Sequence, residues 1–78
     1  MSELQRTPNK GEWLLFDGTK RIAVFCEVKL GRNQERMIRV VTWAEKSEDR
    51  SFVGYFPHLE IAAWTTYRFY LRAIGRLD

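Results

Sequence analysis

Residues 59–77, LEIAAWTTYRFYLRAIGRL, decide the fold, because their apolar side chains recur at helical spacing over the whole stretch. At 100° per residue, eight of them share one broad stripe, which is typical of a helix side that faces a core. The sequence therefore predicts a C-terminal helix that needs a sheet to cover it. The stripe consists of Leu59, Ala63, Trp64, Tyr67, Tyr70, Leu71, Ile74 and Leu77.

A second apolar strip, formed by Ala62, Phe69 and Ala73, lies beside this stripe and leaves only a narrow polar ridge around the helix. One sheet can cover only one of these two surfaces. We therefore predict that the helix also meets a partner subunit, another protein or a ligand, and aromatic and arginine side chains carry much of the energy of protein interfaces. The residues predicted at this interface are Ala62, Trp64, Tyr67, Arg68, Phe69, Arg72 and Ala73.

Ahead of the helix, the chain carries short β-branched and aromatic runs separated by turn signals, which indicates a meander of antiparallel strands. Asp17-Gly18 supplies the left-handed backbone that a tight hairpin turn requires. The charged residues 45–50 are expected to form a solvated loop. The predicted strands are residues 13–16, 21–30, 36–44 and 51–56.

The order of these elements predicts an α+β fold, ββββα, in which a four-stranded antiparallel meander precedes one C-terminal α-helix packed on one face of the sheet. Pro57 ends the last strand, so the helix is expected to begin at His58 or Leu59. Residues 1–11 contain one large apolar side chain besides Met1 and are predicted to be a flexible tail. The single folded domain would then span residues 12–78.

The register between the second and third predicted strands determines what each face of the sheet carries. If Cys26 lies opposite Val40, Arg39 faces Glu27 on the outside, whereas a one-residue slip would drive Arg39 into the core. We adopt the first register. The core face then carries Trp13, Leu15, Ile22, Val24, Cys26, Val28, Leu30, Ile38 and Val40.

The opposite face in this register is too apolar for an ordinary solvated sheet, with Leu14, Phe16, Ala23, Phe25, Val41 and Trp43 among basic residues. Exposed rings can stack on bases while arginines neutralise phosphates, which is what binding of single-stranded nucleic acid requires. Packing against protein is the commoner fate of any one such ring. The residues predicted to bind nucleic acid are Arg21, Phe25, Lys29, Arg39 and Trp43.

Size and charge are compatible with this binding. The chain has 78 residues and a net charge of +3, and nine of its 13 basic residues are arginines, whose guanidinium groups suit phosphate and stacking contacts. A domain of this length buries only roughly 60% of the surface that its unfolded chain exposes, so a monomer would be marginally stable. We therefore predict a homodimer.

Catalytic and cofactor motifs are not apparent in the sequence. His58 and Cys26 are the only histidine and cysteine, so one chain cannot assemble a Cys/His metal cluster, and a thiol on an apolar face is a poor nucleophile. We predict a non-enzymatic protein without cofactor, metal or small-molecule substrate. The lone cysteine and the lack of a signal-like start favour the cytoplasm, and no apolar run approaches the roughly 20 residues of a membrane span.

Four strands followed by a helix, a basic charge and expected dimerisation are together similar to the coactivator-type single-stranded DNA-binding folds, in which that helix mediates dimer contact. The similarity lies in architecture alone and involves no shared motif. Our first hypothesis, motivated by the rings and arginines of the outer sheet face, is a small dimeric protein that binds single-stranded nucleic acid on its sheet. The alternative is a protein-interaction module, such as a small adaptor or inhibitor of the kind found in mobile genetic elements, that binds through its aromatic helix.

Overall fold

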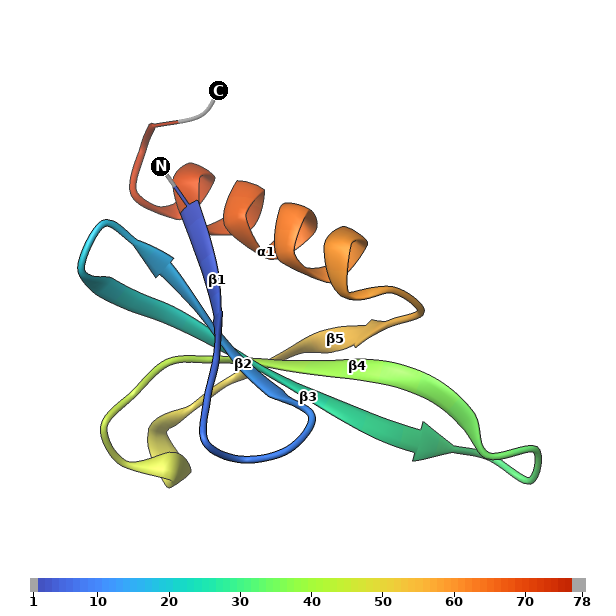
Figure 1. Cartoon of the computed structure of the whole chain (residues 1–78). Helices are drawn as coiled ribbons and strands as arrows, with labels where there is room; N and C mark the ends of the chain where they lie inside the picture. The colour runs from blue at the N-terminus through green and yellow to red at the C-terminus, as the bar shows by residue number, and fades with distance from the viewer. Residues whose placement is uncertain (1, 77–78) are drawn as a thin grey trace.

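The computed structural model describes residues 2–76, which form one antiparallel sheet with a helix lying across one of its faces (Figure 1). Strand order follows the chain, from β1 at one edge to β5 at the other. The α+β class is confirmed, with five strands where the sequence predicts four. The elements are β1 (Ser2–Arg6), β2 (Glu12–Asp17), β3 (Lys20–Leu30), β4 (Glu35–Thr42), the short 3-10 turn η1 (Ser47–Asp49), β5 (Phe52–Phe56) and α1 (Leu59–Ala73).

The additional strand, β1, occupies the segment predicted to be a flexible tail. It pairs with β2 along its whole length, and Leu4, opposite Leu15, packs against the core. Hydrogen bonding along a sheet edge uses backbone groups, so a mostly polar strand with a single apolar anchor leaves little trace in the hydropathy pattern. The tail prediction is therefore wrong for residues 2–6, and Met1 lies outside the described residues.

The pairing of β3 with β4 differs by one residue from the predicted register. Phe25, not Cys26, lies opposite Val40, and both Phe25 and Val40 are fully buried beneath the helix. Cys26 lies opposite Arg39, on the side away from the helix. We expect a one-residue slip to bury Arg39, but the slip instead exchanges the two sides of β3 and leaves Arg39 on the side away from the helix. This register is favoured because enclosing a phenylalanine ring removes far more apolar area from water than enclosing a thiol.

A β-bulge at Ile22 explains why the period-two pattern of β3 predicts the wrong face. Leu15 lies opposite Ala23 while its neighbour Phe16 lies opposite Arg21, so Ile22 is the extra residue. Both Ile22 and Ala23 belong to the buried core cluster. A bulge shifts the alternation by one position, so every later residue of β3 changes sides. The predicted core-face residues that this shift places on the side away from the helix are Val24, which is still buried there, and Cys26, Val28 and Leu30.

The helix is rotated from the predicted stripe and ends earlier. Its deepest residues are Ala62 and Thr66, whose small side chains let the helix approach Phe25 and Val40 closely, while Trp64 of the predicted stripe is 62% exposed. The helix ends at Ala73, because Gly75 has a φ of 77° and the Arg76 N–H donates to the Leu71 carbonyl. Leu77, the last predicted helical residue, lies outside the described residues.

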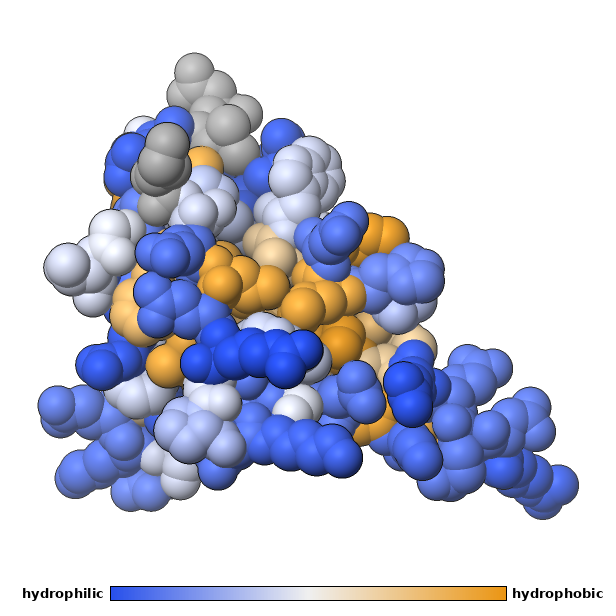
Figure 2. Space-filling view, viewed as in Figure 1, coloured by the Kyte–Doolittle hydropathy of each residue, from blue (hydrophilic) through white to orange (hydrophobic). Residues whose placement is uncertain are grey.

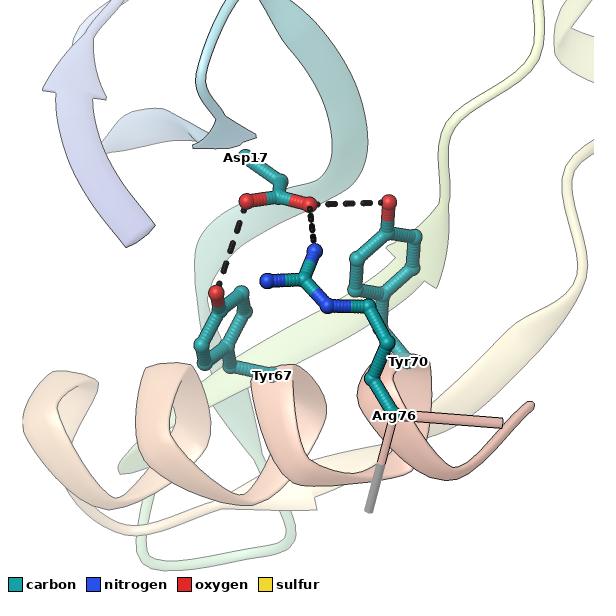
Figure 3. Close-up of polar contacts among 4 residues, drawn as sticks. All are labelled: Asp17, Tyr67, Tyr70 and Arg76. Atoms are coloured by element: carbon teal, nitrogen blue, oxygen red, sulfur yellow. Dashed lines mark hydrogen bonds and ion pairs between the residues drawn. The ribbon is translucent and has the colours of Figure 1, made fainter. Parts of the chain in front are cut away.

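Asp17, at the end of β2, holds the C-terminal half of α1 against the sheet (Figure 3). Tyr70 donates its hydroxyl to Asp17 Oδ2 at 3.0 Å and Tyr67 donates to Oδ1 at 3.4 Å, while Arg76 Nη1 lies 3.4 Å from Oδ2. The hydrogen bond from Tyr70 is the main cause of the lowered pKa of Asp17, and burial raises the pKa of Tyr70. The sequence indicates Asp17 only as a turn residue.

We expect Phe25→Ala to lower the free energy of unfolding by about 3–5 kcal/mol, because it leaves a cavity at the centre of the core. Urea denaturation measures this change. Phe52→Ala is the matched control, since Phe52 is 55% exposed, and we expect it to change the free energy by less than about 1 kcal/mol. Equal losses for the two variants would contradict the observed register.

The lowered pKa of Asp17 means that its ionised form stabilises the fold above the unfolded pKa of about 4, and that this stabilisation disappears as the pH falls through the folded pKa. We expect Asp17→Asn to lower Tm at neutral pH, with the difference from wild type shrinking in acid. Thermal unfolding followed by circular dichroism tests this. Asp49→Asn, an exposed control in η1, should change little, and a pH-independent deficit for Asp17→Asn would count against the role of the charge.

Candidate nucleic-acid interface

The side of the sheet opposite α1 carries the arginines and rings that could contact a ligand. A central row of apolar side chains, with Leu14, Val24 and Val41 side by side, supports this side of the sheet. Two groups of guanidinium and aromatic side chains flank that row. We call this surface the arginine–aromatic face and define it by Phe16, Arg21, Arg39, Trp43, Arg50, Phe52 and Tyr55.

Trp43 organises the first group. The guanidinium carbon of Arg50 lies 4.4 Å from the centroid of the Trp43 ring, and that of Arg21 lies 5.3 Å from it. Arg50 also donates from Nε to the Ala44 carbonyl at 2.9 Å, and Arg21 lies 5.9 Å from the Phe16 ring. One indole thus holds two positive charges at defined positions through cation–π contacts.

The second group lies where β4 meets β5. Arg39 lies 5.7 Å from the centroid of the Phe52 ring, and Phe52 lies 5.2 Å from Tyr55 with the two rings tilted by 59°. Both rings remain open to solvent, with Phe52 55% and Tyr55 43% exposed. Phe52 and Tyr55 are therefore the rings on this face most available for stacking.

A hydrogen-bonded corner at Glu12 borders the face and has a structural role. Glu12 Oε1 accepts from Thr7 Oγ1 at 2.8 Å and from Asn9 Nδ2 at 3.1 Å, and the bond from Thr7 is the main reason why the pKa of Glu12 is lowered. Burial is the main reason why the pKa of the neighbouring Cys26 thiol is raised. The thiol is therefore protonated at neutral pH and is not an activated nucleophile.

The structure brings together three of the five residues predicted to bind nucleic acid. Arg21, Arg39 and Trp43 lie on the arginine–aromatic face. Phe25 does not, because it is fully buried beneath the helix, and Lys29 lies on the same side of β3 as Phe25, in the projecting β3–β4 hairpin.

Sequence reasoning missed three residues of the face, namely Arg50, Phe52 and Tyr55. Arg50 stands in a charged run that indicates a solvated loop, and the segment 51–56 is too short for alternation to assign its faces. The available signal was the pair of aromatic residues around Gly54. A glycine in a strand often marks a bulge, and the register of β4 with β5 does shift beside it.

The residues predicted at a partner interface on α1 do not form one surface. Ala62 is fully buried and Tyr67 is half-buried with its hydroxyl on Asp17, so neither is free to meet a partner. Trp64 and Arg68 lie on the outer side of α1, with the guanidinium 4.8 Å from the ring centroid. Phe69, Arg72 and Ala73 are also exposed, but Phe69 and Ala73 line a groove nearer to β5.

Within residues 2–76, no three histidine, cysteine or acidic side chains come close enough together to hold a metal ion, and α1 lacks the length and apolar character of a membrane-spanning helix. Comparisons of the chain with models of known families, with curated proteins and with solved structures give no significant match. The sheet also has five strands, one more than the coactivator-type folds with which the sequence pattern was compared.

Proposed function

We propose that the protein binds single-stranded nucleic acid on the arginine–aromatic face. The observation that carries the proposal is the clustering of three arginines and four rings on the one side of the sheet that α1 leaves uncovered. Proteins that bind single strands without a deep pocket combine these two features, because rings stack on bases while basic groups follow the backbone.

The exposure of the rings suggests a division of roles. Phe52 and Tyr55 offer open aromatic surface on which unpaired bases can stack. Trp43 already contacts two guanidinium groups, so it acts as a positioning residue that presents Arg21 and Arg50 to phosphates or base planes. A duplex hides the faces of its bases within the stack, so this arrangement favours a single strand.

Charge on the face also favours a polyanion. Arg21, Arg39 and Arg50 share this side of the sheet with Glu3, which lies opposite Phe16, and with Glu12, whose Oε1 accepts from Thr7 and Asn9. The net charge of the whole chain is +3. Each arginine that neutralises a phosphate releases a counterion, so binding should weaken as the salt concentration rises.

Two matched pairs of residues test the site. Arg39 lies over Phe52 on the arginine–aromatic face, and Arg68 lies over Trp64 on the helix. We expect Phe52→Ala to weaken binding by about 1–3 kcal/mol, roughly five- to 150-fold in Kd, and Arg39→Ala to reduce the slope of log Kd against log salt by about 1. Trp64→Ala and Arg68→Ala should change neither. Fluorescence anisotropy of a labelled oligothymidylate measures both quantities.

No binding of the wild-type protein to single strands of DNA or RNA at low salt would contradict the proposal. Equal losses of affinity for the oligothymidylate in the two pairs of variants would contradict the assignment of the site. Unlabelled duplex DNA serves as a competitor, and competition as effective as that of the single strand would argue against stacking as the source of affinity.

Protein–protein interaction through the outer side of α1 is the second candidate function. It is supported by Trp64, which is 62% exposed, and by Ile61 one helical turn away, which is 47% exposed. If the helix is the functional surface, the Trp64 and Arg68 variants should abolish binding to the partner protein, while the Phe52 and Arg39 variants should retain it.

A further inference from the structure

The outer edge of β5 lacks the charges and the proline that commonly protect an exposed strand edge, and its irregularity is the bulge at Val53, where its register with β4 shifts. Its five residues, FVGYF, include no charged side chain and no proline, whereas the opposite edge strand, β1, carries Glu3 and Arg6. Within residues 2–76, the backbone of β5 pairs only with β4. Proteins usually protect an uncovered edge with charges, proline or a bulge that turns it away, because unpaired backbone groups attract another strand.

An apolar groove between α1 and the sheet reaches β5. It has a volume of about 250 Å³ and lies between Phe69 and Ala73 of α1 and the sheet residues Ile22, Thr42 and Val53. Phe69 is 53% exposed there. Thr66, which also lines the groove, is only 5% exposed, and its Oγ1 has no hydrogen-bond partner among the described residues. Phe69 and Ala73 leave apolar surface exposed to water here, so a second apolar surface that covers the groove would be favoured by its burial.

The chain exposes more surface than is usual for a folded monomer of its size. The chain exposes 5842 Å². A folded monomer of 9.3 kDa exposes about 5000 Å², so the excess is roughly 800 Å², close to what each partner buries in a standard protein interface. Figure 2 shows apolar surface between the helix and the sheet, while the projecting β3–β4 hairpin is hydrophilic. The hairpin contributes polar area to the excess, and the β5 edge contributes aromatic area.

We propose that β5 pairs antiparallel with β5 of a second copy of the chain, about a two-fold axis normal to the sheet. Two identical edge strands related by such an axis run in opposite directions and share one sheet, which would then have ten strands. Because the axis is normal to the sheet, the helix-bearing sides of both copies lie on the same side of the joined sheet. Both helices therefore lie on one face, and the two arginine–aromatic faces join into one continuous surface on the other.

A second copy fits this edge because β5 is compatible with itself. The strand has no charge, so self-pairing opposes no like charges, and the exposed rings of Phe52 and Tyr55 would lie beside their counterparts across the axis. On the helix side, the two grooves would meet around the two Phe69 rings. The charged β1 edges remain outside, so assembly stops at a closed dimer.

Light scattering coupled to size-exclusion chromatography tests the dimer without any nucleic acid, so failure of this proposal is distinct from failure of the proposed function. We expect twice the monomer mass of 9.3 kDa for the wild type. Phe69→Lys places an ammonium group in the groove and should raise the dimer dissociation constant by more than about tenfold. Trp64→Lys is the matched control on the outer side of the same helix and should leave the dimer intact.

Amide hydrogen exchange tests whether the β5 edge itself forms the contact. We expect the amides of residues 52–56 that do not bond to β4 to become protected as the protein concentration rises. Ala73→Glu, a second charge in the groove, replaces Phe69→Lys if that variant does not fold. A monomer at all concentrations, a dimer broken by Trp64→Lys but not by the groove variants, or a dimer whose β5 amides exchange as fast as in the monomer would each overturn the proposal.

Discussion

The burial of Phe25 against Val40 beneath α1 is the constraint on which the rest of the structure depends. Once this pair lies in the core, the register of β3 with β4 follows, and Arg39 must lie on the side without the helix. The bulge at Ile22 makes this possible, because it lets Arg21 stay on the outer side while Ile22 and Ala23 join the core. One irregular position thus determines the composition of both faces.

The two proposals concern different surfaces that meet at β5. Phe52 and Tyr55 contribute rings to the arginine–aromatic face, while the backbone edge of the same strand is open to pairing. Pairing of β5 would extend the face without covering it, since side chains on one side of a sheet remain on that side when a strand is added. Dimerisation would therefore bring six arginines to a single surface.

The sequence predicted the elements well and the face of β3 badly. Apolar spacing located the helix, and turn signals located four of the five strands, but no glycine or proline marks the bulge at Ile22. Arg21 precedes the bulge, Arg39 lies in β4 and Trp43 directly follows β4. All three therefore lie on the predicted face of the sheet. Phe25 and Lys29 follow the bulge within β3 and are the two misplaced residues. Strand β1 was not predicted, because its pairing uses backbone groups that leave no hydropathy signal.

The bonds between Asp17 and the helix tyrosines have a consequence for the order in which the chain folds. They join residues 50 and 53 positions apart, whereas every strand pair of the meander joins neighbours along the chain. Local hairpins close quickly, and contacts between distant residues wait for a costlier loop closure. Strand pairing can therefore precede the docking of α1, and the ring of Phe25 stays open to water until the helix packs over it.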